Sequence, residues 1–409
     1  MEGYFELLEQ NGLSHNVLHL AGHGTTQTSM RGFDPRPLDE GELKDLCALL
    51  ENAMDQGAAG VSFGLGYEPG IFFPTSQIKE IARLVKKKDK IITVHGRAFT
   101  PISTIYPDRS DTPHNIISLQ EMIDVSRETG VRMQYSHLIF VGEKAFPTCP
   151  RALETLDEAI AQGVDIMVDS FPYHCGQSII NVVIPPWFLA DLPAHYKDPK
   201  AVEAVEESLN ITGDILGFGP GDIQLTFADH PDYRDCIGLF MDEIAAKKNM
   251  SPGRVILDLS EKTRGTASIL NHRYSNMEII DALMPHPACL FMTDAIPIGS
   301  GVENPSAYGA FPLFLQYARE RGRLSLEKAV HKMTGATAKR FNIRDRGLLR
   351  KGLAADITVF DWKTIRDNNT VKKTNQMPTG IKAVFINGEP VLEEGKVNST
   401  AKAGTLLRS

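Results

Sequence analysis

The sequence predicts an α/β fold built on a parallel sheet. Six short apolar or β-branched runs recur along the chain, and amphipathic helical segments separate most of them. The runs are apolar on both faces, as in strands that are buried inside a ring of helices. Because strand and helix alternate at this spacing, the sheet is either a barrel or a doubly wound sheet. The predicted strands are 17–21, 58–65, 90–95, 131–137, 164–169 and 288–294.

Each predicted helix follows from its own local pattern. Helical periodicity runs from about Asp39 to Gln56, and a second helix opens near Thr75 and Ser76. Two more are expected over about 116–128 and 150–161. They alternate with the strands, which supports the parallel arrangement.

Residues 180–275 break this alternation. The segment holds a predicted strand at 222–227 and two predicted helices near 234–247 and 251–260. We interpret it as a lid-like insertion between two core strands.

The sequence pattern changes again near Gly347. Strands are expected at 352–361 and 381–391, and Asn387-Gly388 is a strong hairpin signal. The predicted organisation is therefore a barrel over 1–345, with the insertion inside it, and a small β domain over 346–409.

Composition narrows the class of protein. With 42% hydrophobic and 23% charged residues, the chain is ordinary for a globular protein. Its net charge of −8 disfavours nucleic acid and anionic membranes as partners. The five cysteines are scattered and never form a C-x-x-C pair, which argues against a disulfide framework or a cysteine zinc site. No spanning apolar run or secretory signal is present, so the cytoplasm is the expected compartment.

Three polar residues end predicted buried strands, namely His95, His137 and Asp294. Parallel strands present their carboxyl ends on one face, where active sites lie. Two imidazoles and a carboxylate there could hold Zn²⁺, and a carboxylate beside a metal-bound water could act as general base. A single histidine at a strand end is more often structural, so spacing alone supports a metal site and a structural role about equally. The chain lacks the G-x-G-x-x-G of a dehydrogenase and the G-x-S-x-G of a serine hydrolase.

Other side chains are expected at the same mouth. His23, after the first strand, either lines the pocket or caps a turn. Tyr67 lies in a strand-to-helix loop and could close over substrate. Asp169 ends another predicted strand, and Tyr173 follows it.

The ordered set of motifs resembles the N-acyl-D-amino-acid deacylases of the amidohydrolase superfamily. The set is Gly22-His-Gly-Thr, Gly64-Leu-Gly-Tyr-Glu-Pro-Gly70, Thr93-Val-His-Gly-Arg97, Ser136-His-Leu, Pro172-Tyr and the aspartate Asp294. The resemblance implies a metal-binding (β/α) barrel with a small β-sandwich, and one or two Zn²⁺ ions. It implies metal ligation by His95 and His137, water activation by Asp294, and substrate contacts from Tyr67 and Arg97.

The chain departs from the family pattern at its start and at positions where the family binds its substrate. The strand 1 His-x-His pair and the bridging cysteine of the family are absent, which implies that strands 1 and 2 are missing. Ile139 stands where the family has lysine. Besides deacylation of N-acyl-D-amino acids, two readings stay open: an inactive remnant, and a relative acting on cyclic amides such as hydantoins. The open barrel edges would then need self-association or an upstream fragment.

Overall fold

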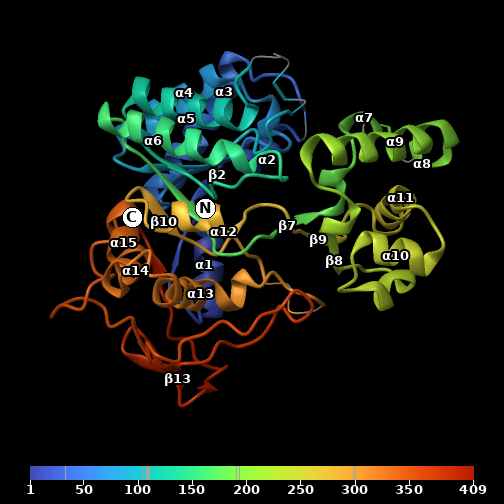
Figure 1. The fold of residues 1–409 in the computed structure, drawn as a ribbon. Coiled ribbons are helices and arrows are strands. Elements are labelled where there is room, and N and C mark those ends of the chain that lie inside the picture. The colour runs from blue at the N-terminus through green and yellow to red at the C-terminus, as the bar shows by residue number, and fades with distance from the viewer. Residues whose placement is uncertain are drawn as a thin grey trace.

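The predicted strands form one six-stranded parallel sheet in the computed structural model (Figure 1). The structure describes residues 1–32, 34–103, 105–106, 111–189, 191–192, 194–297, 299 and 301–409. The strand order is β10-β6-β5-β4-β3-β2, and every neighbouring pair is parallel. The strands are β2 (Ala21–Gly22), β3 (Gly60–Gly64), β4 (Ile91–His95), β5 (Arg132–Tyr135), β6 (Ile166–Ser170) and β10 (Cys289–Phe291). Closure into a barrel and the loss of two strands stay predictions.

Four helices cover one face of this sheet (Figure 1). In α4, Ile78, Ile81, Ala82 and Val85 are buried at the i, i+3, i+4, i+7 spacing of an amphipathic helix. Asp39 begins α3 with a capping box to Glu42. The helices are α3 (Glu40–Asp55), α4 (Thr75–Lys87), α5 (His114–Thr129) and α6 (Cys149–Ala161), close to the predicted bounds.

The two faces of the sheet carry different side chains. Residues in register alternate between faces, so Phe63, Val94 and Tyr135 share the face that packs on the helices. The other face carries Thr93 and Gln134, which are directly paired and buried. The sheet thus has one apolar face and one face with polar groups, and the site is built on the second.

Two predicted strands end earlier than expected. β5 stops at Tyr135 and β10 at Phe291, whereas the sequence placed His137 and Asp294 as last strand residues. Both have a positive φ, 36° and 50°, which cannot continue a strand. The run at 17–21 is also divided, because β1 (Val17–Leu18) pairs with β15 (Leu406–Leu407) instead of the main sheet.

The inserted segment forms a lobe with a core of its own, which Figure 1 shows beside the main sheet. Its antiparallel sheet has the order β7-β9-β8, and the expected strand at 222–227 is β8. The expected helix at 234–247 is shorter, because Gly238, with φ of 90°, interrupts it before α10. The elements are β7 (Gly176–Ile179), α7 (Pro186–Leu189), α8 (Ala194–Lys197), α9 (Pro199–Leu216), β8 (Ile223–Phe227), α10 (Met241–Lys248), α11 (Pro252–Thr263) and β9 (Ser268–Asn271).

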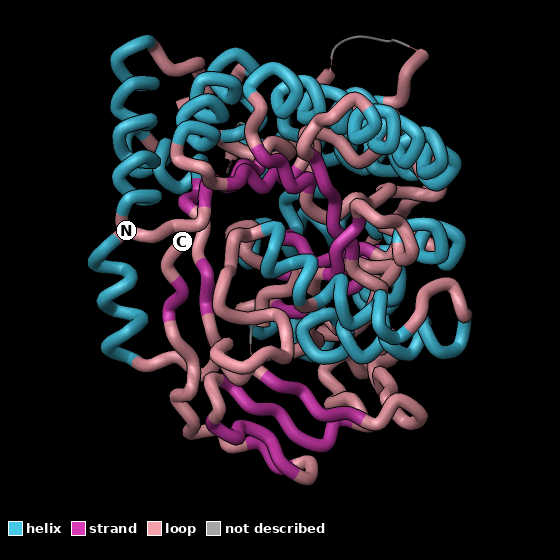
Figure 2. The backbone as a smooth tube through the Cα atoms, turned by 90° about the vertical axis from the view of Figure 1, so that its left-hand side faces the viewer, coloured by secondary structure: helices cyan, strands magenta, loops and turns pink. Residues whose placement is uncertain are grey.

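The C-terminal part is helical and then β. A four-stranded antiparallel sheet has the order β11-β12-β13-β14, and Asn387 and Gly388 form its predicted hairpin turn with positive φ at both. Because β15 pairs with β1, the chain ends lie close together (Figure 2). The strands are β11 (Ile357–Phe360), β12 (Ile381–Ile386), β13 (Glu389–Glu393) and β14 (Lys396–Val397).

The remaining helices flank the sheet and its ends. They are α1 (Glu2–Asn11), α2 (His23–Arg31), α12 (Met277–Leu283), α13 (Ser306–Arg321), α14 (Leu326–Met333) and α15 (Gly335–Arg340). Among the described residues, no helix is both long and apolar enough to cross a bilayer.

Candidate active site

Two histidines meet at the carboxyl ends of neighbouring strands. His95 ends β4, and His137 lies two residues past the end of β5. Nδ1 of His95 lies 2.8 Å from Nε2 of His137. Burial and the neighbouring His137 hold the pKa of His95 well below its usual range, so its ring is neutral at physiological pH. A neutral ring nitrogen is the form that binds a metal ion.

Aromatic rings enclose this pair. Phe99 lies edge-on to His95 at 4.8 Å between ring centroids, and its ring is 5.1 Å from that of His137. Tyr67 lies 5.0 Å from the His95 ring. A Cβ on Gly66 would lie 2.7 Å from Nε2 of His95, so the imidazole fits only because residue 66 has no side chain.

The loop predicted to close over substrate therefore lies against the histidine pair. Tyr67 is 55% exposed, so its ring is open to a ligand on one side. Its hydroxyl lies over Gly64, where partial burial first and Asp294 second raise its pKa above the usual value.

A buried aspartate accepts a hydrogen bond from the backbone of His137. The backbone N–H of His137 donates to Oδ1 of Asp169 at 2.6 Å. Burial raises the pKa of Asp169 to about 6, and the hydrogen bond from His137 opposes that rise. Asp169 lies on β6, the strand next to β5.

Asp294 lies in the same electrostatic neighbourhood without joining the pair. Its charge contributes to raising the pKa of Tyr67, of Asp169 and of Tyr274. Its backbone carbonyl accepts a 2.9 Å hydrogen bond from Asn304, which anchors the segment after β10. Within the described part of the chain, no three His, Cys, Asp or Glu side chains come together closely enough to hold a metal ion. The assignment of Asp294 as ligand and catalytic residue stays a prediction.

His23 lies apart from the histidine pair. Its ring stacks on Phe63 at 4.7 Å and lies 4.1 Å from Phe73, on the face of the sheet that packs against helices. It is fully buried, and neither ring nitrogen makes a hydrogen bond of normal geometry. Burial, with Arg97 as a second cause, lowers its pKa to about 3. These contacts are those of a core histidine, and none supports the predicted substrate contact.

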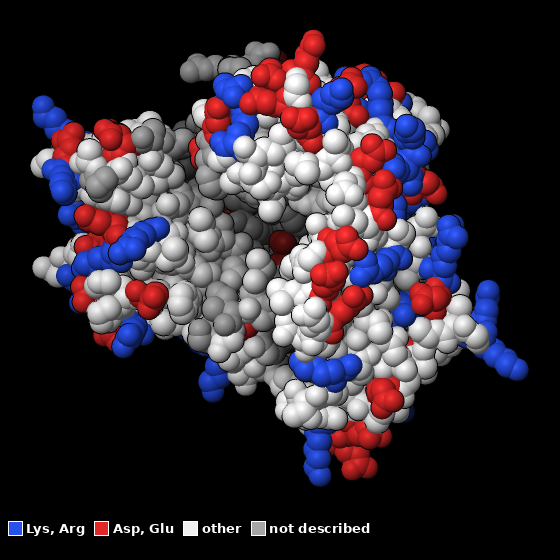
Figure 3. All heavy atoms as spheres, turned by 180° about the vertical axis from the view of Figure 1, so that it is seen from behind, with Lys and Arg blue, Asp and Glu red and all other residues white. Residues whose placement is uncertain are grey.

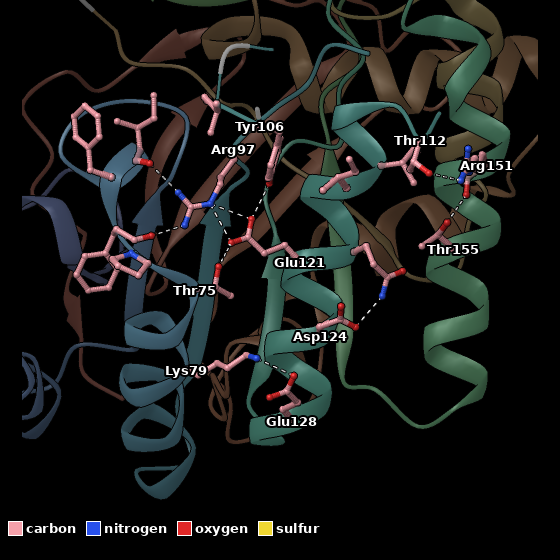
Figure 4. Close-up of a pocket in the computed structure, with 18 residues that line it drawn as sticks. Thr75, Lys79, Arg97, Tyr106, Thr112, Glu121, Asp124, Glu128, Arg151 and Thr155 are labelled. Atoms are coloured by element: carbon pink, nitrogen blue, oxygen red, sulfur yellow. Dashed lines mark hydrogen bonds and ion pairs between the residues drawn. The ribbon is translucent and has the colours of Figure 1, made fainter. Parts of the chain in front are cut away.

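Arg97 holds a loop in place. Its Nε donates to both carboxylate oxygens of Glu121 at 3.0 Å, and its terminal nitrogens donate to the carbonyls of Gly70, Ile71 and Phe73. Figure 4 shows this cluster at the wall of a cavity of about 860 Å³ between α4 and α5. The cavity is not lined by His95 or His137. Arg97 thus fixes the segment that follows Tyr67, and its predicted contact with substrate stays a prediction.

Tyr173 points toward the C-terminal part of the chain. Its hydroxyl donates to Oδ2 of Asp367 at 2.8 Å and accepts from Asn369 at 3.3 Å. Its predicted substrate contact is not among these interactions and stays a prediction.

The donor set of the pair suits a metal ion. Nδ1 of His137 is buried and has no hydrogen-bond partner, while the facing nitrogens of the two rings are already side by side. Imidazole nitrogens are the ligands that Zn²⁺ and similar ions prefer. Figure 3 shows a hollow between the inserted lobe and the rest of the molecule, with an acidic side chain deep inside.

Sequence reasoning missed three members of the site region. Phe99 carries no motif, and Gln134 reads as an ordinary strand residue. Arg340 is 206 residues from Gln134, yet it donates to that side chain. Only the alternation of faces along β5 could have indicated Gln134.

Comparison with known proteins agrees with this fold. The model of the Amidohydrolase family matches residues 248–392. D-aminoacylase of Alcaligenes xylosoxydans xylosoxydans is 26% identical over 392 residues, which cover 96% of this chain and 70% of that protein. N-acyl-D-glutamate deacylase of the same organism is 26% identical over 411 residues, covering 100% and 72%. The structure of N-acyl-D-glutamate deacylase from Bordetella bronchiseptica, complexed with zinc and a phosphonate inhibitor, superimposes with a TM-score of 0.81 at 24% identity, covering 100% and 75%.

The fold and the sequence are thus those of an amidohydrolase, a hydrolase that acts on carbon–nitrogen bonds. Within that class, the chain is similar along nearly its whole length to D-aminoacylase and to the N-acyl-D-amino-acid deacylases.

Proposed function

We propose that this protein hydrolyses the amide bond of N-acyl-D-amino acids, with a zinc ion held by His95 and His137. The observation that carries the proposal is the 2.8 Å approach of two imidazoles at the carboxyl ends of β4 and β5. The pKa of one of them, His95, is lowered by burial, which favours its neutral form. The relatives that match nearly the whole chain are a D-aminoacylase and deacylases of N-acyl-D-aspartate and N-acyl-D-glutamate.

The bound metal would polarise the amide carbonyl and lower the pKa of a water. Around the metal, we assign a role to each of three side chains. Asp294 takes the proton of the attacking water and returns it to the leaving nitrogen. Tyr67, beside His95, orients the substrate at the mouth, and Phe99 keeps water from the back of the pair.

The alternatives are weaker. Relatedness to deacylases along the chain does not favour an inactive remnant or a hydrolase of cyclic amides. A 5-substituted hydantoin is therefore included in the test as a substrate that we expect to be left intact.

The test combines metal content with a substrate panel. The purified chain is loaded with Zn²⁺, dialysed and measured by elemental analysis, then assayed with N-acetyl-D-methionine, N-acetyl-D-aspartate, N-acetyl-D-glutamate and their L-isomers. We expect bound zinc and release of acetate from at least one D-substrate in preference to its L-isomer. Bound zinc with cleavage of the hydantoin alone, or no cleavage of any D-substrate, would refute the proposal.

A further inference from the structure

A row of three buried polar side chains runs behind the histidine pair. Asp169 belongs to β6, Gln134 to β5, and Arg340 is the last residue of α15. Their exposed fractions are 9%, 0% and 7%. Burying an amide, a carboxylate and a guanidinium is costly unless each is hydrogen-bonded, so their contacts need an explanation.

The hydrogen bonds of the row are all donated in the same direction, from Arg340 toward Asp169. Arg340 Nε donates to Oε1 of Gln134 at 3.2 Å, and Nε2 of Gln134 donates to Oδ2 of Asp169 at 2.7 Å. The other carboxylate oxygen, Oδ1, accepts the backbone N–H of His137 at 2.6 Å. A guanidinium only donates and a carboxylate only accepts, so the amide of Gln134 can take just one orientation.

The row ends on a backbone that needs support. His137 has φ of 36°, a left-handed conformation that is unfavourable for a residue with a side chain. The next amide, that of Leu138, donates to the carbonyl of Asp169 at 2.8 Å. Asp169 therefore holds two successive amides at the turn that carries the His137 ring to His95.

The far end of the row is equally fixed. Arg340 also donates to the carbonyl of Met133 and forms an ion pair with Asp165, so its guanidinium is anchored on both β5 and the start of β6. An apolar trio of similar volume would fill the same space without the desolvation cost. Apolar side chains could not hold the two amides.

We propose that Asp169, oriented by Gln134 and Arg340, is a positioning residue that holds His137 in its left-handed conformation and so sets its ring opposite His95. Its effect on catalysis rests on the proposed function, whereas its effect on His137 does not. Asp169 acts through His137.

The direction of the row supplies a sharp test with two single variants and their combination. In Asp169→Asn, an amide faces an amide, and either orientation of Gln134 leaves two donors opposed. In Gln134→Glu, two carboxylates face each other. In the double variant Asp169→Asn, Gln134→Glu, the new carboxylate at position 134 accepts from both Arg340 and the new amide at position 169. The carbonyl oxygen of that amide still accepts from the backbone N–H of His137.

The main readout is the amide resonance of His137 in protein labelled with [15N]histidine. The resonance is assigned by its loss in His137→Gln, and zinc content and kcat are measured alongside. We expect both single variants to shift this resonance and to lower kcat by about tenfold or more. The double variant should return the resonance toward its original position and kcat to within about threefold of wild type. Gln224→Glu, a buried glutamine in the inserted lobe, is the matched control and should leave the His137 resonance in place.

The outcomes separate this proposal from the proposed function. If the wild type cleaves no panel substrate, the His137 resonance and zinc content still decide the role of the row. A His137 resonance unmoved in both single variants, or a double variant with no recovery, would overturn the proposal. If the single variants do not fold, a double variant that folds with a near-original resonance supports it, and one that does not fold overturns it.

Discussion

His95 and His137 face each other through single ring nitrogens 2.8 Å apart, although 42 residues separate them in the chain. The contact arises because β4 and β5 are adjacent and parallel, and because the backbone turns into a left-handed conformation at His137. Either one ring donates to the other, or both nitrogens turn to a shared ion.

Replacing either histidine should abolish the metal site. We expect His95→Ala and His137→Ala to lose bound zinc and to lower kcat/KM by about 100-fold or more, because each removes one of two facing donors. Elemental analysis and steady-state kinetics check this. His331→Ala, on the exposed surface of α14, should retain both metal and activity. Full zinc retention in both site variants would show that the ion is held elsewhere.

A side chain at position 66 should disturb the histidine pair. In Gly66→Ala the new Cβ would meet Nε2 of His95 at 2.7 Å, which forces the ring or the loop to move. We expect kcat to fall by about tenfold or more, while Gly163→Ala has no neighbour within 4 Å and leaves kcat unchanged. Gly163 also has φ of 84°, so its variant controls for a loss of stability without displacement of the site. An unaltered kcat in Gly66→Ala would mean that the loop relaxes freely.

Arg97 and Glu121 should behave as a unit. Breaking a buried ion pair by removing one partner costs about 3–5 kcal/mol, so Arg97→Met and Glu121→Gln should both lower the melting temperature. If Arg97 acts by fixing the loop at 70–73, both variants also raise KM together. A higher KM in Arg97→Met with an unchanged KM in Glu121→Gln would instead support the direct substrate contact that the sequence predicted.

His23 should make the protein less stable in acid. Its pKa is about 3 when folded and near 6.5 when unfolded, so the unfolded chain takes up a proton first as the pH falls. Below pH 6.5, the His23 ring therefore lowers the free energy of unfolding by about 1.4 kcal/mol for each pH unit, until the pH reaches about 3.

The variant His23→Phe tests this assignment. The substitution removes two buried nitrogens that have no hydrogen-bond partner, between Phe63 and Phe73. The free energy of unfolding, measured by urea denaturation, should therefore depend less on pH between about pH 6.5 and 4. Activity should be retained, because the ring lies on the helix-packed face. A large rise in KM would restore the predicted role of His23 in substrate binding.

The sequence by itself determined which segments form the parallel sheet, and it placed His95 correctly as the last residue of its strand. The alternation of apolar runs and helical periodicity depends on local physics, and so does the Asn387-Gly388 turn, because positive φ at both positions favours these residues. His95 and His137 could be expected together since parallel strands align their carboxyl ends.

Only the tertiary structure decided which face each side chain takes. His23 follows its strand by one residue and packs with Phe63 and Phe73, away from the pair, because register with β3 sets its face. Arg97 forms an ion pair with Glu121, a partner on α5 that no motif indicates. The link from Arg340 to Asp169 joins α15 to β6, and such contacts depend on packing between elements distant in sequence. A strand pattern gives the period of two, but the neighbours on each face come from the assembled sheet.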